Sequence, residues 1–286
     1  MKDNIHIILD SVSAVQETDL LHDPRVHVIK LVVSHGNQEW LDGDKKLEEM
    51  FALVDSSGKL PSTSQPPIGQ ILDVYNGLVN QGKKIIFITL DSALSGTYQT
   101  ACMAAQQVMN ENKQADIRVI DSKTAAVPIV GFAEKLLKKI ESGCEDMDEL
   151  ERYGNDLVKR TATYFSVNTL EYLRKGGRIG KASALIGSIL GIRPILHLDK
   201  DGKVEVADKC RSRKKVLKRI VEIAHDEGEL ESIYVSNALA EEDALTIETE
   251  LKAMNPGVPS MRSSIGTVLS AHLGPGVVGV FVTRKA

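Results

Sequence analysis

Cysteine is scarce in this sequence and is not grouped. Cys102, Cys144 and Cys210 lie more than forty residues apart, and no CxxC pair occurs. A dense set of paired cysteines marks a small disulfide-stapled protein, and closely spaced cysteines mark a structural zinc site. We therefore expect neither a disulfide framework nor a metal centre, and we expect the three thiols to be reduced.

Long apolar runs are also missing. No segment approaches the ~18 consecutive apolar residues of a membrane span, and the apolar run within MKDNIHIILD at the N-terminus is too short for the core of a signal peptide. The sequence contains no P-loop GxxxxGK[ST] and no GxSxG nucleophile elbow. We expect a cytoplasmic protein without an integral membrane span.

Charge of one sign is not in excess. The formal net charge is −4, apolar residues make up 42% of the chain, and charged residues make up 26%. This balance is typical of a globular protein, and it provides no broad basic field for nucleic acid. The 286 residues suffice for two domains at roughly 150 residues each.

Short β-branched runs alternate with segments of helical periodicity in the first half of the chain. The predicted strands are Ile5–Leu9, Val26–Val33, Ile85–Leu90 and Ile117–Ile120, and the predicted helices are Lys45–Val54, Ile68–Gln81, Tyr98–Asn112 and Val130–Ser142. Apolar strands that alternate with helices predict a buried, mainly parallel sheet. Ligands of such sheets bind at the carboxyl ends of the strands.

Small polar residues follow three of these strands. Asp10 and Ser11 follow the first, residues 91–97 follow the third, and Asp121 and Ser122 follow the fourth. The pattern predicts a polar cluster at one edge of the sheet. The alternative is that each serine or aspartate only caps a helix or forms a turn, which is the commoner role of these residues at strand ends.

The pattern of strands and helices changes after Arg160, and we place the domain boundary near this residue, giving domains at 1–163 and 164–286. The second domain is predicted to be mixed α/β. Its predicted strands are Phe165–Asn168, Ser232–Ser236 and Val277–Val282, and its predicted helices are Leu170–Lys175, Val216–His225 and Glu241–Met254. The stretch Pro194–Val206 predicts a hairpin, because Asp201 and Gly202 suit a tight turn between two alternating runs.

Two loops carry candidate anion donors. Ser95 and Gly96 lead from the apolar strand into a helix, where unpaired amides and a hydroxyl suit a carboxylate or a phosphate. Thr63 and Ser64 lie in a second loop that prolines stiffen. For both loops the alternative is a plain helix cap.

One histidine and two basic segments complete the candidates. His272 lies in a glycine-rich stretch near the last strand, where an imidazole can donate to a carboxylate, although a structural role is the alternative. Arg178 belongs to a glycine-rich basic loop, and Arg211 belongs to the basic run 209–215. Such segments suit a phosphate or an acidic protein surface, and a solvated turn or helix end is the alternative.

Taken together, these motifs resemble those of the DegV family. They run in the family's order over nearly the whole chain. The matching segments are Asp10-Ser11, Thr63-Ser-Gln-Pro66, Ser92-Ala-Leu-Ser-Gly-Thr-Tyr98, Leu173-Arg-Lys-Gly-Gly-Arg178, Arg193-Pro-Ile195 and His272-Leu-Gly-Pro-Gly276. The one departure is Arg193, which stands where lysine is common and keeps the positive charge.

The resemblance implies a two-domain α/β protein with a Rossmann-like first domain. It implies that a long-chain fatty acid such as palmitate binds in a buried tunnel between the domains, and that no cofactor or metal is needed. By motif position, Thr63, Ser95, Gly96 and His272 contact the carboxylate. Arg178 and Arg211 match positions associated with the catalytic subunit of a fatty acid kinase, to which such carriers present the acyl chain. The chain itself is then a lipid-transport protein without its own catalysis.

Two alternatives remain. The first is a serine acyl hydrolase with Ser95 as nucleophile, His272 as base, and Asp91 or Asp121 as the residue that orients the base. The missing GxSxG elbow argues against it. The second is a regulator that binds a phosphate or sugar phosphate between the Ser95 helix end and the Arg178 loop.

Overall fold

The computed structural model describes residues 4–186 and 191–286. The chain divides into two compact units. Unit 1 consists of Met1–Val32 and Ser64–Lys159, and unit 2 consists of Val33–Thr63 and Arg160–Ala286. Each unit has a sheet and a core of its own.

The core of unit 1 is a parallel four-stranded sheet in the order β2-β1-β6-β7. Its strands are β1 (Ile5–Asp10), β2 (Val26–Ile29), β6 (Lys84–Thr89) and β7 (Ile117–Asp121), and the short 3-10 helices η1 (Ser11–Ser13), η2 (Val15–Glu17) and η3 (Asp19–His22) connect the first two. All six residues of β1 are buried. A strand buried on both faces is what a parallel sheet between helices requires.

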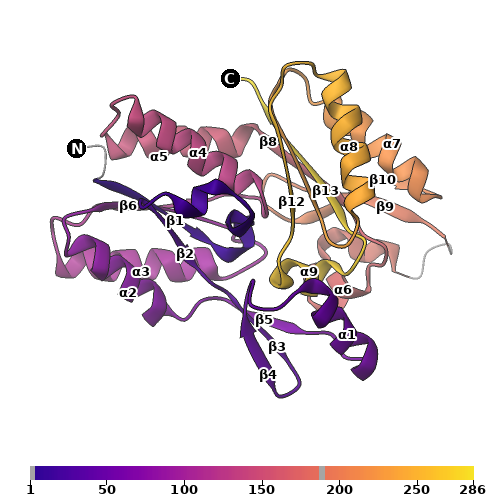
Figure 1. Ribbon diagram of the computed structural model, residues 1–286, viewed down its shortest axis with the longest axis horizontal. Helices are drawn as coiled ribbons and strands as arrows, with labels where there is room; N and C mark the ends of the chain where they lie inside the picture. Colours follow the sequence, from indigo (N-terminus) through magenta and orange to yellow (C-terminus); the bar gives the residue numbers. More distant parts are fainter. Residues whose placement is uncertain (1–3, 187–190) are drawn as a thin grey trace. The chain divides into compact units, whose positions relative to one another are not determined.

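Helices cover both faces of this sheet (Figure 1). They are α2 (Ile68–Val79), α3 (Thr97–Glu111), α4 (Pro128–Glu141) and α5 (Met147–Arg160). Helices α2 and α3 share a core with the sheet, in which the Tyr75 and Phe87 rings meet edge to face at a centroid distance of 6.4 Å. The prediction of a buried parallel sheet is confirmed.

Unit 2 is built on a six-stranded mixed sheet in the order β10-β9-β8-β13-β11-β12. The strands are β8 (Thr161–Ser166), β9 (Arg193–Leu198), β10 (Val204–Cys210), β11 (Leu230–Asn237), β12 (Ser260–Ser264) and β13 (Val278–Arg284). The β11–β12 pair is parallel, and the other pairs are antiparallel. The remaining elements along this part of the chain are α6 (Glu171–Lys175), η4 (Gly180–Leu185), α7 (Arg213–His225), α8 (Glu241–Met254) and α9 (Thr267–Leu273).

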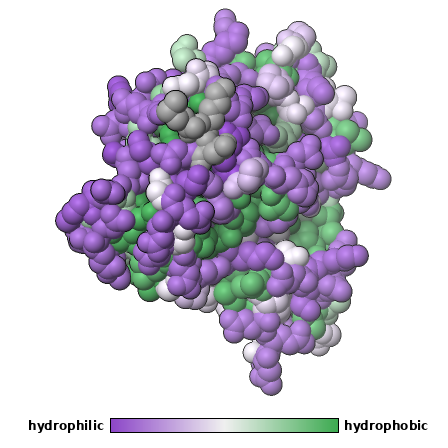
Figure 2. All heavy atoms as spheres, turned by 60° about the vertical axis from the view of Figure 1, so that its left-hand side comes forward, coloured by the Kyte–Doolittle hydropathy of each residue, from purple (hydrophilic) through white to green (hydrophobic). Residues whose placement is uncertain are grey.

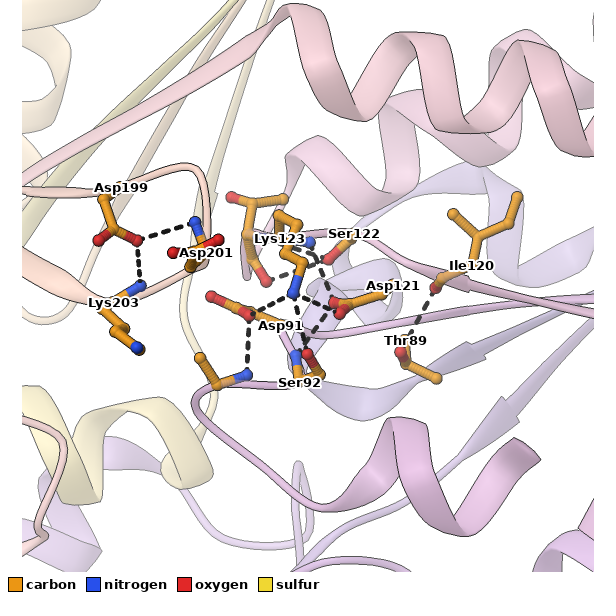
Figure 3. Close-up of polar contacts among 12 residues, drawn as sticks. Thr89, Asp91, Ser92, Ile120, Asp121, Ser122, Lys123, Asp199, Asp201 and Lys203 are labelled. Atoms are coloured by element: carbon orange, nitrogen blue, oxygen red, sulfur yellow. Dashed lines mark hydrogen bonds and ion pairs between the residues drawn. The ribbon is translucent and has the colours of Figure 1, made fainter. Parts of the chain in front are cut away.

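The predicted hairpin is confirmed as β9 and β10. Gly202 takes a φ of 80° in the turn, which favours glycine. Asp199 Oδ1 accepts from the amides of Asp201 and Lys203, both at 2.9 Å (Figure 3). These acidic residues therefore serve the turn.

Segment Val33–Thr63 groups with unit 2, although the sequence places it in the first domain. It contains β4 (Gln38–Leu41), α1 (Leu47–Ser57) and all but one residue each of β3 (Val32–His35) and β5 (Ser62–Ser64), and these strands form a three-stranded sheet in the order β4-β3-β5. Side chains tie it to unit 2, since Asp42 bonds to Thr267 and the rings of Phe51 and Tyr172 meet edge to face. Contacts between residues far apart in the sequence decide its placement.

The single strand predicted at Val26–Val33 is wrong in one respect, because β2 ends at Ile29 and β3 begins at Val32 in a different sheet. Helices α5 and α9 were not predicted.

Polar residues cover most of the face shown in Figure 2, and apolar residues reach that surface in patches between them.

Candidate functional site

The carboxyl edge of the unit 1 sheet gathers the polar residues that the sequence predicts there. Asp10, at the end of β1, is fully buried. Its Oδ2 accepts from the Leu90 amide at 2.6 Å, and its Oδ1 accepts from the Val12 amide at 3.2 Å. A buried carboxylate needs such donors. Asp10 therefore joins the end of β1 to the loop that follows β6.

Lys123 connects the loop after β6 to the end of β7 (Figure 3). Lys123 Nζ lies 2.7 Å from Asp121 Oδ2 and donates to Ser92 Oγ at 3.0 Å. The Ser92 amide donates to Asp121 Oδ1 at 3.0 Å. Asp91 stabilises a turn within this loop, because its Oδ1 accepts a hydrogen bond from the Ala93 amide at 2.9 Å. Both aspartates thus hold the loop that carries Ser95.

Ser95 is partly buried and hydrogen bonded at the start of α3. Its hydroxyl lies 3.0 Å from Thr97 Oγ1 and accepts from the Thr97 amide at 3.3 Å. The Ser95 amide donates to the Asp91 carbonyl at 3.2 Å. The N-cap residue of α3 is Gly96, so the Ser95 hydroxyl supports the turn before the helix, and the ligand role of Ser95 stays a prediction.

Gly96 lies against a side chain from another loop, which the sequence does not reveal. Its φ of −75° suits any residue, but a Cβ atom there would lie 1.8 Å from Gln65 Oε1. The Gln65 amide group donates to Thr100 Oγ1 at 2.5 Å, and that hydroxyl donates to the Gly96 carbonyl at 3.1 Å. Gln65, from the second predicted polar loop, therefore packs directly against the glycine.

Within unit 2, the fold brings Thr63 and His272 together across 209 positions of sequence. Thr63 Oγ1 lies 2.7 Å from His272 Nε2. Thr63 comes from β5, and His272 comes from the last turn of α9. The two predicted head-group residues of this unit thus form one hydrogen-bonded pair.

His272 is held in its neutral form. Burial, together with the positive charge of Arg178, lowers the pKa of His272 to about 4. Its Nδ1 is buried and has no hydrogen-bond partner among the described residues. A Cβ atom at Gly176 would lie 2.3 Å from that nitrogen, so only glycine leaves room for the ring.

Neutral imidazole has one donor nitrogen and one acceptor nitrogen. When Nε2 carries the proton, it donates to Thr63 Oγ1, and the threonine hydroxyl is then free to donate to a ligand oxygen. When Nδ1 carries the proton, Thr63 donates to Nε2 instead. Only the first arrangement leaves the hydroxyl proton of Thr63 for a carboxylate, and it does so without a charged imidazole.

The two predicted partner residues differ in their surroundings. Arg178 is partly buried, and its Nη1 donates to the Gly176 carbonyl at 2.6 Å. Its positive charge contributes to the lowered pKa of His272. Arg211 is exposed between β10 and α7.

Several supporting residues were missed in the sequence. The Asn168 amide group donates to the Pro275 carbonyl at 3.1 Å, and Arg213 Nη2 donates to the Gly276 carbonyl at 2.8 Å. Both hold the loop that follows His272. Asp42 caps α9 at its other end. No local pattern marks these residues, because their partners lie far away in the sequence.

Two features of the structure concern membrane spans and metal sites. Among residues 4–186 and 191–286, no helix is both long enough and apolar enough to cross a membrane. In the same described part of the chain, no three or more His, Cys, Asp or Glu side chains are grouped so that they could hold a metal ion.

Known proteins with this sequence pattern and this fold are numerous. A family profile described as uncharacterised protein, DegV family, matches residues 4–285. Protein DegV of Bacillus subtilis (strain 168) is 32% identical over 282 residues, covering 97% of this chain and 98% of that protein. A DegV domain-containing protein of Clostridium perfringens is 30% identical, covering 99% of both chains.

Solved structures agree over the full length. A DegV family protein from Thermus thermophilus, described for its fatty acid binding, superposes with a TM-score of 0.89 at 26% identity, covering 99% of this chain and 100% of that one. DegV from Bacillus subtilis, described as a fatty acid binding protein, gives 0.87 at 30% identity, covering 99% of each chain. The motifs, the full-length profile match and the shared fold agree, and the chain belongs to the DegV family.

Proposed function

We propose that this protein binds a long-chain fatty acid such as palmitate and holds its carboxylate through Thr63 and His272. The observation that carries the proposal is the 2.7 Å contact between Thr63 Oγ1 and His272 Nε2, formed by residues 209 positions apart. The full-length likeness to DegV proteins described as fatty acid binding adds support. The protein acts as a carrier in lipid transport or fatty acid metabolism.

The tail and the head group pose opposite energetic problems. Removing a sixteen-carbon chain from water gains on the order of 10 kcal/mol before entropy costs, at about 0.8 kcal/mol per methylene. A carboxylate removed from water without partners costs several kcal/mol. In this proposal His272 donates from Nε2 to Thr63, and the Thr63 hydroxyl donates to the carboxylate. Arg178 adds a positive charge that attracts the anion.

Ser95 and Gly96 are proposed as further head-group donors. Their support is the Ser-Gly-Thr motif that they share with the family, together with the firm hold on their loop by Asp121 and Lys123. The Gly96 amide and the Ser95 hydroxyl are the donors in question.

Native mass spectrometry of the purified protein tests the binding proposal. We expect a bound mass that lipid extraction identifies as a free fatty acid. The variant Thr63→Val is expected to lower palmitate affinity by a factor of about ten to a hundred, since one lost hydrogen bond to a charged group is worth roughly 1.5 to 3 kcal/mol. Thr161→Val is the matched control, because it removes a hydroxyl from another threonine pair of unit 2, bonded at 2.8 Å to Thr283. A phosphorylated polar ligand, or equal affinity in both variants, refutes the proposal.

We also propose that a fatty acid kinase catalytic subunit receives the bound acyl chain. The support is the family resemblance of the Arg178 loop and of the basic run around the exposed Arg211. Mixing the loaded protein with such a subunit and ATP is expected to yield acyl phosphate, trapped with hydroxylamine. Arg211→Ala is expected to reduce this yield while leaving palmitate affinity unchanged.

The rival function is acyl hydrolysis at Ser95. It needs the Ser95 hydroxyl to pass its proton to His272. Each of the two side chains is hydrogen bonded within its own unit, Ser95 to Thr97 and His272 to Thr63. A fluorophosphonate probe separates the two functions: stable labelling of Ser95 supports the hydrolase, and absence of labelling supports the carrier.

A further inference from the structure

Asp42 contacts the first turn of α9 from a distant part of the chain. Asp42 directly follows β4, and it is only 1% exposed. Its Oδ1 accepts from Thr267 Oγ1 at 3.0 Å and from the Val268 amide at 3.1 Å. The first amides of a helix lack partners within the helix, and an aspartate oxygen is among the best acceptors for them. Asp42 therefore caps α9 across 226 positions of sequence.

Two neighbours fit closely around this cap. A Cβ atom at Gly266 would lie 2.5 Å from Asp42 Oδ1, so a larger residue there displaces the carboxylate. The φ of Gly266 is −72°, which any residue can adopt, and the need for glycine is therefore steric. Trp40 Nε1 donates to Thr267 Oγ1 at 3.3 Å. Strand β4 and the residue that follows it thus hold α9 through the Trp40 indole and the Asp42 carboxylate.

The opposite end of the same helix carries His272. His272 lies five positions after Thr267, which corresponds to about 7.5 Å along a helix axis. Asp42 and Thr63 both belong to segment Val33–Thr63, whose strands form one small sheet. Helix α9 is therefore held by one segment at two points, by Asp42 at its start and by Thr63 at its end.

We propose that Asp42 is a positioning residue, which fixes the first turn of α9 so that His272 on the last turn meets Thr63 in the geometry that binds a carboxylate. The consequence for affinity rests on the proposed function. Asp42 does not contact the ligand in this scheme and acts only through α9. Helix α9 has only seven residues, so a displacement of its first turn also displaces its last turn.

The test is the NMR titration of the His272 ring in the ligand-free variant Asp42→Ala. Loss of a nearby negative charge alone lowers the pKa of His272, because a carboxylate favours the charged imidazole. Loosening of α9 has the opposite effect, since water reaches the ring and raises its pKa from about 4 toward 6.5. We expect a rise, and an unchanged or lower value overturns the proposal.

Affinity for palmitate is the second readout. We expect the dissociation constant of Asp42→Ala to rise about tenfold, which corresponds to about 1.4 kcal/mol. Asp42→Asn keeps an oxygen that can accept both hydrogen bonds, and we expect it to restore most of the wild-type titration and affinity. An Asn variant as impaired as the Ala variant contradicts the capping role.

The matched control is Asp146→Ala in unit 1. Asp146 Oδ1 also accepts from two amides at the start of a helix, those of Asp148 at 2.9 Å and Glu149 at 3.2 Å. Its loss removes the same kind of cap from α5, and we expect the His272 titration and palmitate affinity to stay at wild-type values. A His272 shift in this control equal to that of Asp42→Ala shows a general loss of stability and overturns the proposal.

Thr267→Val provides a milder perturbation if Asp42→Ala does not fold. It removes the hydroxyl that joins Asp42 to Trp40, and we expect the His272 pKa to rise in this variant too. An unchanged pKa overturns the proposal. The titration needs no ligand, so it judges Asp42 even if the wild-type protein fails to bind palmitate, which by itself refutes only the proposed function.

Discussion

The neutral state of His272 makes stability depend on pH in a way that one substitution isolates. In the folded protein the pKa of His272 is lowered to about 4, from an ordinary value of 6.5. As pH falls below 6.5, the unfolded chain takes up a proton at this ring before the folded protein does. The stability contributed by the neutral ring is complete above 6.5 and is lost as pH falls toward 4.

The size of the effect follows from the two pKa values. Each pH unit between them is worth about 1.4 kcal/mol, so the full difference amounts to about 3 kcal/mol. Between pH 7 and pH 5 the linkage relation gives a loss of about 2 kcal/mol in the free energy of unfolding. His272→Gln has no group that titrates here, so it lacks this part of the pH dependence.

Urea unfolding followed by circular dichroism at pH 7, 6 and 5 provides the assay. We expect the difference in unfolding free energy between wild type and His272→Gln to change by about 2 kcal/mol across this range. His22→Gln, at an exposed histidine, is the control and should track the wild type. A wild-type curve parallel to that of His272→Gln would refute the claim that the ring is buried and neutral.

Three further substitutions test the packing around the site. Gly96→Ala is expected to cost about 1 kcal/mol in thermal unfolding, because the new methyl group displaces Gln65, and a second substitution Gln65→Ala should recover most of the loss. Gly176→Ala places a methyl group against the His272 ring, and isothermal titration should show palmitate binding weakened roughly tenfold, whereas wild-type affinity would contradict the close contact. Asp10→Ala leaves a buried strand-end amide without its acceptor, and chemical denaturation should show a loss of roughly 2 to 3 kcal/mol, whereas a change below about 0.5 kcal/mol would contradict that role.

Local patterns in the sequence were sufficient to predict much of the fold of unit 1. The runs Ile5–Leu9 and Ile85–Leu90 are apolar at every position or nearly so, and such runs between helical segments fit only a buried parallel sheet. The polar residues after them were expected at one edge, and the bonds from Leu90 to Asp10 and from Ser92 to Asp121 lie there. The roles of these carboxylates as loop supports were not apparent, because side-chain partners are set by tertiary packing.

The unit to which segment Val33–Thr63 belongs could not be predicted from the sequence. Its residues follow β2 without any break in composition, and the sequence offered one strand where the structure has β2 and β3 in different sheets. Strand periodicity reports which face of a strand is buried, and it carries no information about which sheet the strand joins. Its place in unit 2 depends on contacts of Asp42 and Phe51, whose partners lie in the last third and in the middle of the chain, respectively.

The alternating α/β architecture, the family and the candidate residues Thr63 and His272 could be predicted from periodicity and short motifs. The pairing of Thr63 with His272, the neutral state of the ring, and the way in which Asp42 and Gly176 shape its surroundings became apparent only in the folded chain. Burial, close packing and long-range hydrogen bonds depend on distances between residues that the chain brings together only when it folds.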